Sequence, residues 1–232
     1  FAQFSILPSP GMTRESPFYF GERFFESIGT FFTFNTEKKI ERLIMLAEER
    51  LSEAAFLAEH VHVHTGITML DFKDQFGDAV ARADKRDSIE AKEKILVSLA
   101  KQFSVFEDIL DSAREDTRII VEPIYDNQRK TQKRFLFELA EKNQSRAADI
   151  GFASIRERLI ALKNEIELGR RYETGIIASH VQDIFDVLVS SALSEEIKSK
   201  EFISLVSDNI TRALETFDAI ERGAKQPDLD VR

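Results

Sequence analysis

The chain has 232 residues with no cysteine or tryptophan, and its 32 basic and 41 acidic side chains give a formal net charge of −9. The absence of cysteine excludes disulfides, thiolate metal centres and a cysteine nucleophile. The acidic balance argues against a nucleic-acid partner, because proteins that bind the phosphate backbone neutralise it with clustered Lys and Arg. No apolar stretch reaches the roughly 18–20 residues that a membrane span requires.

The composition favours helix along almost the whole chain. Only 9 residues are Gly and 5 are Pro, and the long runs are rich in Glu, Lys, Arg, Ala and Leu, which lose little rotamer freedom on a helix. We predict an all-α fold, an elongated multi-helix bundle of long antiparallel, coiled-coil-like helices. The expected organisation is an extended segment over 1–15, a single helical domain over 16–222 and a flexible tail over 223–232.

Two helices are expected in the N-terminal part of the helical domain. Pro17 follows a serine that can cap a helix, and its missing N–H costs nothing at the first helical position, so a short helix should run from here to about Thr30. The second helix should open at Asn35 or Thr36, because apolar residues recur from there at spacings of three and four. It is expected to stop at Gly66.

The middle of the chain carries the most regular pattern. After a shorter helix over about 70–83, Asp87 and Glu90 match a capping box, and a seven-residue apolar repeat follows. This pattern predicts one long helix with a coiled-coil-like seam, which Pro123 should end or kink. The short β-branched run RIIVEPIY, residues 118–125, also allows a strand.

The C-terminal half continues the helical periodicity. Apolar spacing resumes over 127–166, where Gly151 could be a kink or a break. A connection is expected over 169–175, followed by an amphipathic helix over 177–192. The last predicted helix begins at about Ser194 or Ser199, runs to Ile220 and is followed by a glycine at the position that often ends a helix.

The stretch from Leu7 to Ala58 combines several short motifs: Ser-Pro-Phe-Tyr, Phe-Thr-Phe, Glu-Lys-Lys and Ala-Glu-Glu-Arg-Leu-x-Glu-Ala. In this combination it resembles the bacterial domain-of-unknown-function 5667 family. It departs from the family pattern at Gly21 and Glu22, where the family tends to have an apolar residue and a lysine. The matching positions are Ser16, Pro17, Phe18, Tyr19, Arg23, Glu26, Phe32, Thr33, Phe34, Glu37, Lys38, Lys39, Leu43, Ala47, Glu48, Arg50, Leu51, Glu53 and Ala54.

The resemblance implies a location. Similar proteins look like extracytoplasmic helical domains that follow a signal peptide or membrane anchor, with no assigned activity. A chain that begins at Phe1 without a methionine agrees with a processed N-terminus, although an artificial boundary would look the same. We therefore expect a secreted, periplasmic or cell-surface protein that an upstream anchor could hold near a membrane.

We interpret residues 16–64 as a structural clip. In this interpretation Pro17 starts the first helix, Tyr19 and Phe34 belong to an aromatic set that packs onto the apolar stripe of the second helix, and Arg50 pairs with a carboxylate. Replacing Tyr19 and Phe34 by alanine should then lower the melting temperature by several degrees.

One constellation resembles metal chemistry. His60, His62 and His64 form the run HVHVH; on a helix the first and third share a face, and on an extended segment all three point one way. Such a set could bind Zn²⁺ or Cu²⁺. A solvated or helix-capping cluster is the other interpretation, because the carboxyl end of a helix favours histidine for electrostatic reasons alone.

The sequence contains no catalytic motif of the nucleophile-elbow, phosphate-loop, dinucleotide-binding or zinc-protease type. We therefore expect a non-catalytic protein without a cofactor. The leading hypothesis is an extracytoplasmic helical protein with a structural or protein-interaction role, which binds a partner or itself along exposed heptad seams. The alternative is a periplasmic or surface protein that binds metal through His60, His62 and His64.

Overall fold

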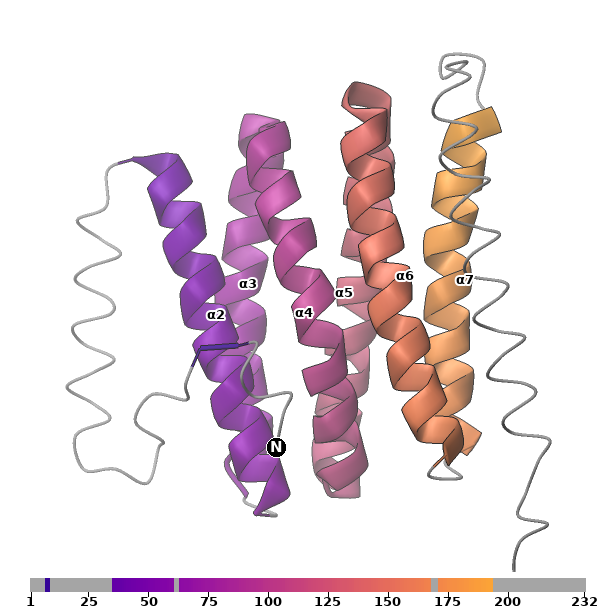
Figure 1. Cartoon of the computed structure of the whole chain (residues 1–232). Helices are drawn as coiled ribbons and strands as arrows, with labels where there is room; N and C mark the ends of the chain where they lie inside the picture. Colours follow the sequence, from indigo (N-terminus) through magenta and orange to yellow (C-terminus); the bar gives the residue numbers. More distant parts are fainter. Residues whose placement is uncertain (1–6, 9–34, 61–62, 168–170, 194–232) are drawn as a thin grey trace, which may run out of the picture. The chain divides into compact units, whose positions relative to one another are not determined.

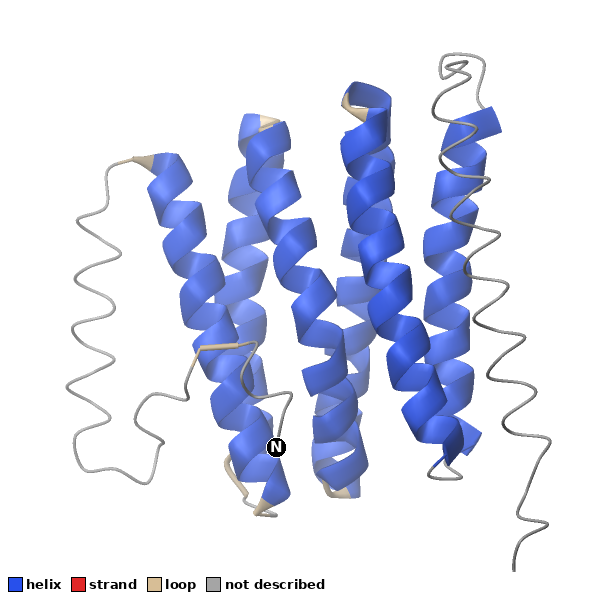
Figure 2. Ribbon diagram, in the orientation of Figure 1, coloured by secondary structure: helices blue, strands red, loops and turns tan. Residues whose placement is uncertain are grey.

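The computed structural model describes residues 7–8, 35–60, 63–167 and 171–193, and all regular secondary structure in these residues is helical (Figures 1 and 2). The predicted all-α helical bundle is therefore confirmed. Tertiary contacts group the chain into two compact units, Phe1–Gln132 and Lys133–Arg232, a division that the sequence did not predict. The helices are α2 (Thr36–Glu59), α3 (Thr65–Arg86), α4 (Ile89–Ser112), α5 (Glu115–Lys142), α6 (Gln144–Glu167) and α7 (Arg171–Leu193).

Helix α2 begins where the sequence indicated and ends earlier. Asn35 is the N-cap, and its side-chain oxygen accepts hydrogen bonds from the backbone N–H groups of Glu37 and Lys38 at 2.9 and 3.2 Å. The prediction that α2 runs to Gly66 is wrong, because this glycine lies in the first turn of α3 and is buried. A Cβ at this position would lie 2.9 Å from Cδ1 of Ile120, so the glycine serves close packing.

The connection between α3 and α4 corrects the predicted capping box. Asp87 adopts a left-handed conformation with φ 47° and closes α3, and its backbone N–H donates to the carbonyl groups of Ala83 and Asp84. The N-cap of α4 is Ser88, whose hydroxyl oxygen accepts from the N–H of Ala91 at 3.2 Å. The start of α4 was therefore misplaced by one residue, and α3 extends beyond the expected range 70–83 at both ends.

The single long helix expected up to Pro123 is two helices. Helix α4 ends at Ser112, and α5 starts after a break of two residues and continues through Pro123. The segment considered as a strand is therefore helical. Further along the chain, α6 passes through Gly151 without interruption, and an unpredicted break at Asn143 separates it from α5; the side-chain oxygen of Asn143 accepts from the N–H of Arg146 at 3.2 Å.

In the first unit, α2, α3 and α4 follow one another in alternating directions (Figure 1). Helix α2 packs against both α3 and α4, which also pack against each other. Aromatic rings fill the core: Phe72 of α3 lies edge-on to Phe106 of α4 with centroids 5.3 Å apart. Tyr125 of α5 lies edge-on to Phe103 and Phe106 at 5.5 and 5.8 Å. Edge-to-face contacts of this kind add to the stabilisation from burial.

In the second unit, α6 and α7 pack closely. Leu188 of α7 lies directly over Gly151, where a Cβ would be 3.0 Å from each of its two methyl carbons. The ring of Phe152 meets Phe185 edge-on at 6.5 Å. Throughout the described part of the chain, no helix is both long and apolar enough to cross a membrane.

Candidate functional site

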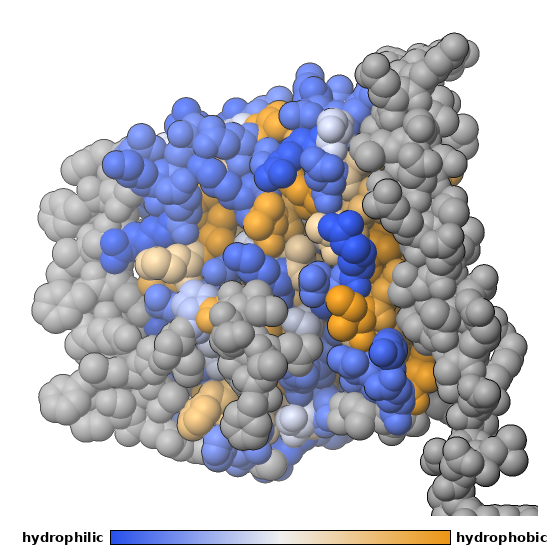
Figure 3. All heavy atoms as spheres, viewed as in Figure 1, coloured by the Kyte–Doolittle hydropathy of each residue, from blue (hydrophilic) through white to orange (hydrophobic). Residues whose placement is uncertain are grey.

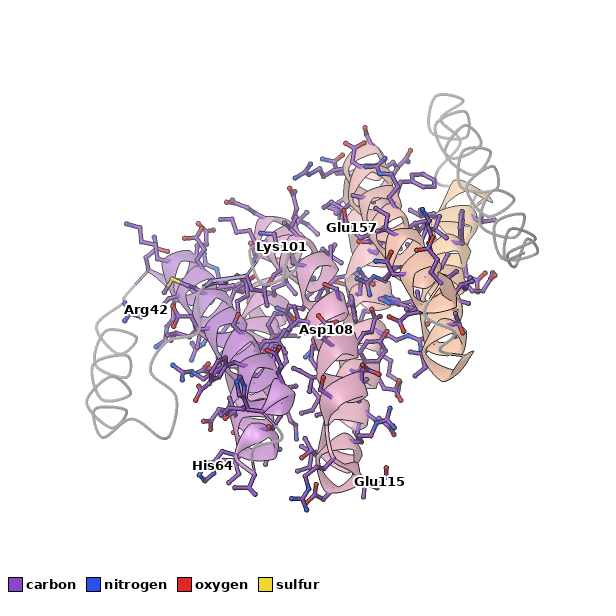
Figure 4. The ribbon with its side chains drawn as sticks, turned by 60° about the horizontal axis from the view of Figure 1, so that its bottom comes forward. Arg42, His64, Lys101, Asp108, Glu115 and Glu157 are labelled. Atoms are coloured by element: carbon purple, nitrogen blue, oxygen red, sulfur yellow. The ribbon has the colours of Figure 1, made fainter. Side chains whose placement is uncertain are left out.

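The histidine run lies where α2 gives way to α3. His60 is the C-cap of α2 and His64 the N-cap of α3, so the shared helical face expected for these two residues is not formed. His62 lies outside the described residues. Nδ1 of His60 is 2.7 Å from the carbonyl oxygen of Phe56, and its ring stacks at a tilt on the ring of Phe56. Figure 4 shows His64 at this end of the helices.

Metal ligation requires several donor side chains that converge on one point. No group of three or more His, Asp or Glu side chains arranged to hold a metal ion occurs among them. His60 and His64 therefore each lie at a helix end, and His60 lies beside the exposed ring of Phe56. Pro17, Tyr19 and Phe34, the other named members of the predicted clip, lie outside the described residues.

The carboxylate that pairs with Arg50 is Glu53, one turn further along α2. Nη1 of Arg50 lies 2.5 Å from Oε2 of Glu53, and both side chains are 0% exposed. A buried charge is tolerated only when it is paired and hydrogen-bonded. The ion pair is thus part of the core of the first unit. A second arginine, Arg158 of α6, is likewise buried.

A row of polar contacts that sequence reasoning missed joins α2 to α4. The hydroxyl of Ser98 donates to Oε1 of Glu48 at 2.5 Å and accepts from Nε2 of Gln102 at 2.8 Å. Each of these contacts uses residues buried or half-buried between the helices. The contact between Ser98 and Glu48 favours one alignment of α2 and α4, because these two groups would lose each other as partners if one helix slid along the other.

The same row ends at the surface in a three-residue ion network. Nζ of Lys94 lies 2.7 Å from a carboxylate oxygen of Glu41 on α2 and 2.7 Å from one of Glu90 on α4. Hydrogen bonding to these two carboxylates raises the pKa of Lys94. The hydrogen bond from Lys94 and its positive charge hold the pKa of Glu90 below its ordinary value. The network is exposed to solvent, so it helps to align α2 with α4 and does not provide a reactive group.

Helix α3 presents apolar residues to solvent as well as to the core. At about 100° per residue, its buried residues Phe72, Phe76 and Ala83 fall on the side opposite Ile67 and Leu70. These two side chains are 46% and 42% exposed, and Val63 in the preceding turn is 69% exposed. The exposed positions recur at spacings of three and four, and we call them the outer stripe of α3. The outer stripe consists of Val63, Ile67, Leu70, Asp74, Gly77 and Ala81.

The outer stripe is the most regular of several exposed apolar positions. Figure 3 shows apolar side chains reaching the surface among charged ones on the face in view. Single exposed apolar residues are normal on protein surfaces, whereas a contiguous series on one helix face points to an interaction. The sequence alone did not reveal the outer stripe, because its apolar residues have the same spacing as those of a helix face buried in the core. The other large exposed apolar side chains are Met45, Phe56, Val97, Ile119, Phe137 and Ile160.

The site thus comprises a helical bundle with a buried ion pair, a polar row that aligns two helices and an outward apolar stripe, all in the first unit. These features define a helical-bundle protein with a candidate interaction face. A family model described as a domain of unknown function, DUF5667, matches residues 11–159. The chain therefore belongs to this family, and the match extends well beyond the N-terminal resemblance, through α2 to α5 into α6. Neither the curated proteins nor the solved structures compared with the chain give a significant match.

Proposed function

We propose that this protein is a non-catalytic, extracytoplasmic helical protein that acts by binding another protein chain. The observation that carries the proposal is the outer stripe of α3. Its three large apolar side chains remain 42–69% exposed although the same helix buries a full apolar face on its other side. Leaving such residues in water forfeits the free energy that their burial would provide, about 25 cal/mol per Å² of apolar surface. A protein partner that covers the stripe would recover it.

A photo-reactive side chain tests the proposal in the cell. Ile67 is replaced by the photo-cross-linking residue p-benzoylphenylalanine in the bacterium that makes the protein, and cells are irradiated and analysed by mass spectrometry. The matched control carries the same residue at Ile119, which is 66% exposed on α5. We expect one defined cross-linked protein from position 67 and none from 119. No adduct at 67, or the same adducts at both positions, would contradict the proposal.

The extracytoplasmic location is supported by the N-terminal resemblance over residues 7–58. The chain also contains no cysteine, so an oxidising compartment would have no thiol to alter. A fusion to alkaline phosphatase, an enzyme that requires disulfides to fold, tests the location. We expect phosphatase activity when the natural gene product carries this fusion. Activity from a β-galactosidase fusion alone would indicate the cytoplasm and overturn this part of the proposal.

Metal binding is the second candidate function, and one contact favours it. Because Nδ1 of His60 lies 2.7 Å from a backbone carbonyl oxygen, a proton on that nitrogen would leave Nε2 with the lone pair that a metal requires. Calorimetric titration with Zn²⁺ tests the candidate, with a His60→Ala/His64→Ala variant as the control. Micromolar binding that the variant loses would support a metal site. The absence of binding heat would remove it.

A further inference from the structure

We propose that the partner of the outer stripe is a second copy of this chain, packed with its α3 antiparallel to the first. This inference deepens the proposed function and rests on it, because it identifies the chain that covers the stripe. A two-fold axis makes the same surface serve both copies, so that residue i contacts residue j and j contacts i. The stripe must therefore be complementary to its own reverse.

The sizes of the side chains meet this requirement in the central part of the stripe, from Leu70 to Ala81. The amino-terminal half carries the bulky Val63, Ile67 and Leu70, and the carboxyl-terminal half carries the small Gly77 and Ala81. A two-fold axis at the middle of α3 (Thr65–Arg86) sets Leu70 opposite Ala81 of the second copy. At this position a large residue meets a small one, which lets the helices approach closely there. A parallel pair would place large against large and leave the small half unfilled.

The open surroundings of Gly77 agree with a helix docking there. A Cβ at this position would meet nothing within 4 Å, so its own fold does not require a glycine for space. Glycine in a helix interior is less favourable than alanine. In the antiparallel pair Gly77 lies opposite Asp74 of the second copy and leaves room for that side chain to reach water.

Charge favours the same orientation. The first half of α3, residues 65–75, has one Lys and two Asp, hence 1 − 2 = −1, and the second half, residues 76–86, has three basic and two acidic residues, hence 3 − 2 = +1. Antiparallel packing brings halves of opposite sign together, and parallel packing brings like halves together. A parallel pair would also set the two Asp74 carboxylates face to face, which is unfavourable.

Mass measured across a concentration series tests for the dimer. One pair of 22-residue helices buries an area at the small end of specific interfaces, so we expect a reversible dimer with a dissociation constant on the order of micromolar. Leu70→Asp should raise this constant at least about tenfold, because it places a charge where Ala81 of the second copy would pack. Ile119→Asp, which puts the same charge on an exposed apolar site of α5, should leave it unchanged.

Both substituted side chains are exposed in the single chain, so both variants should fold; equal far-ultraviolet circular dichroism and melting temperature check this. A wild-type chain that is monomeric up to about 1 mM, the weak limit of specific association, would overturn the inference. An Ile119→Asp variant that loses the dimer while Leu70→Asp keeps it would overturn it as well.

Introduced cysteines test the orientation without interference, because the chain has no cysteine of its own. Leu70→Cys and Ala81→Cys chains carrying tags of different size are mixed and treated with a short bismaleimide. We expect the mixed dimer to form and each variant alone to cross-link poorly. Efficient cross-linking of Leu70→Cys with itself would indicate a parallel pair and overturn the proposed geometry.

Failure of this inference and failure of the proposed function give different results. If the photo-reactive residue at Ile67 captures a different protein in cells while the purified chain stays monomeric, the stripe binds a protein and the second copy is the wrong partner. If position 67 captures nothing and the chain is monomeric, both the partner and the interaction role are wrong. Capture of the chain itself, together with a dimer that Leu70→Asp dissociates, supports both.

Discussion

Arg50 and Glu53 form an ion pair inside the first unit, with Nη1 and Oε2 2.5 Å apart and neither side chain exposed to solvent. The two residues are one turn apart on α2, so the helix itself brings the opposite charges together. The pair therefore forms within a single helix and enters the core already neutralised. Its loss would leave one charge in a low-dielectric environment, which is far less favourable than the loss of a pair at the surface.

We predict that Arg50→Met lowers the free energy of unfolding by about 3–5 kcal/mol, because the carboxylate of Glu53 loses its guanidinium while it remains buried. The double variant Arg50→Met/Glu53→Leu should lose less, since neither charge of this pair then remains in the core. Urea denaturation followed by circular dichroism measures both. The control is Arg82→Met, which breaks the exposed pair with Asp78 and should cost no more than about 1 kcal/mol.

If Arg50→Met and Arg82→Met lowered stability equally, the buried pair would have no special importance for the core. A double variant that is less stable than the single variant would show that Leu at position 53 fails to pack. A Glu53→Gln/Arg50→Met variant then distinguishes the effect of the buried charge from the effect of side-chain shape, because Gln keeps the shape of Glu without its charge.

The close contact between Gly151 and Leu188 predicts opposite effects for two glycine substitutions in the second unit. Gly151→Ala places a methyl group 3.0 Å from the methyl carbons of Leu188, and overpacking of this kind costs about 1–3 kcal/mol. Gly175→Ala meets nothing within 4 Å in α7 and should gain about 0.5–1 kcal/mol from helix propensity. Thermal melts of the two variants compare them, and a gain for Gly151→Ala would show that α6 and α7 can separate without cost.

Pro123 provides a third prediction. It lies inside α5, where proline removes one backbone hydrogen bond and its ring crowds the carbonyl four residues earlier, at a cost of about 3 kcal/mol. We expect Pro123→Ala to raise the free energy of unfolding by about 1–3 kcal/mol, with Glu122→Ala as the neighbouring control near zero. Hydrogen exchange of the amides around residue 119 should be slower in the Pro123→Ala variant than in the wild type. Reduced stability would mean that α5 depends on the restricted backbone conformation of proline at this position.

The contact between Lys94 and Glu90 predicts a pH-dependent contribution to stability. The lysine holds the pKa of Glu90 below its ordinary value of 4.5. Because the folded state favours the charged carboxylate, the contribution is present above that value and disappears as the pH falls through the lower pKa of the folded state. Glu90→Gln should therefore melt slightly below the wild type at pH 7, and this difference should shrink as the pH is lowered below 4.5.

High salt supplies the control for this prediction. Both charges are exposed, and at about 1 M NaCl the screening length falls to about 3 Å, so the difference between Glu90→Gln and the wild type should shrink at pH 7. A difference that grows as the pH falls would contradict the assigned direction of the pKa shift.

Local sequence patterns predicted the helices well and their ends less well. Asn35 was recognised as a helix start because its cap is satisfied within three residues, by Glu37 and Lys38. Gly66 was interpreted as a helix stop, but the reason for a glycine there is the side chain of Ile120, more than fifty positions away. Such a contact leaves no local signal.

Pro123 also shows that local sequence does not determine where a helix ends. Propensity predicts that a helix ends or kinks at Pro123, and α5 does not end there. Two residues later, Tyr125 packs against Phe103 and Phe106. Its hydroxyl donates a hydrogen bond to Oε1 of Glu107 at 3.1 Å. Packing from another helix therefore holds a segment that its own sequence disfavours.

The features of the candidate site also differ in whether the sequence could predict them. The carboxylate partner of Arg50 was predictable because it lies three positions away on one helix. The contact between Ser98 and Glu48 was not, because it joins two helices. The outer stripe of α3 has a readable spacing, but spacing alone does not distinguish a second apolar face from the core face; the burial of Phe72 and Phe76 makes that distinction.

The short connections between the helices have a consequence for the speed of folding. One residue joins α5 to α6, and two residues join α3 to α4 and α4 to α5. Mostly local contacts reduce the entropy lost in closing loops, so domains of this kind fold in about microseconds to milliseconds. The α2–α3 hairpin can therefore assemble on the nascent chain before α5 has been synthesised.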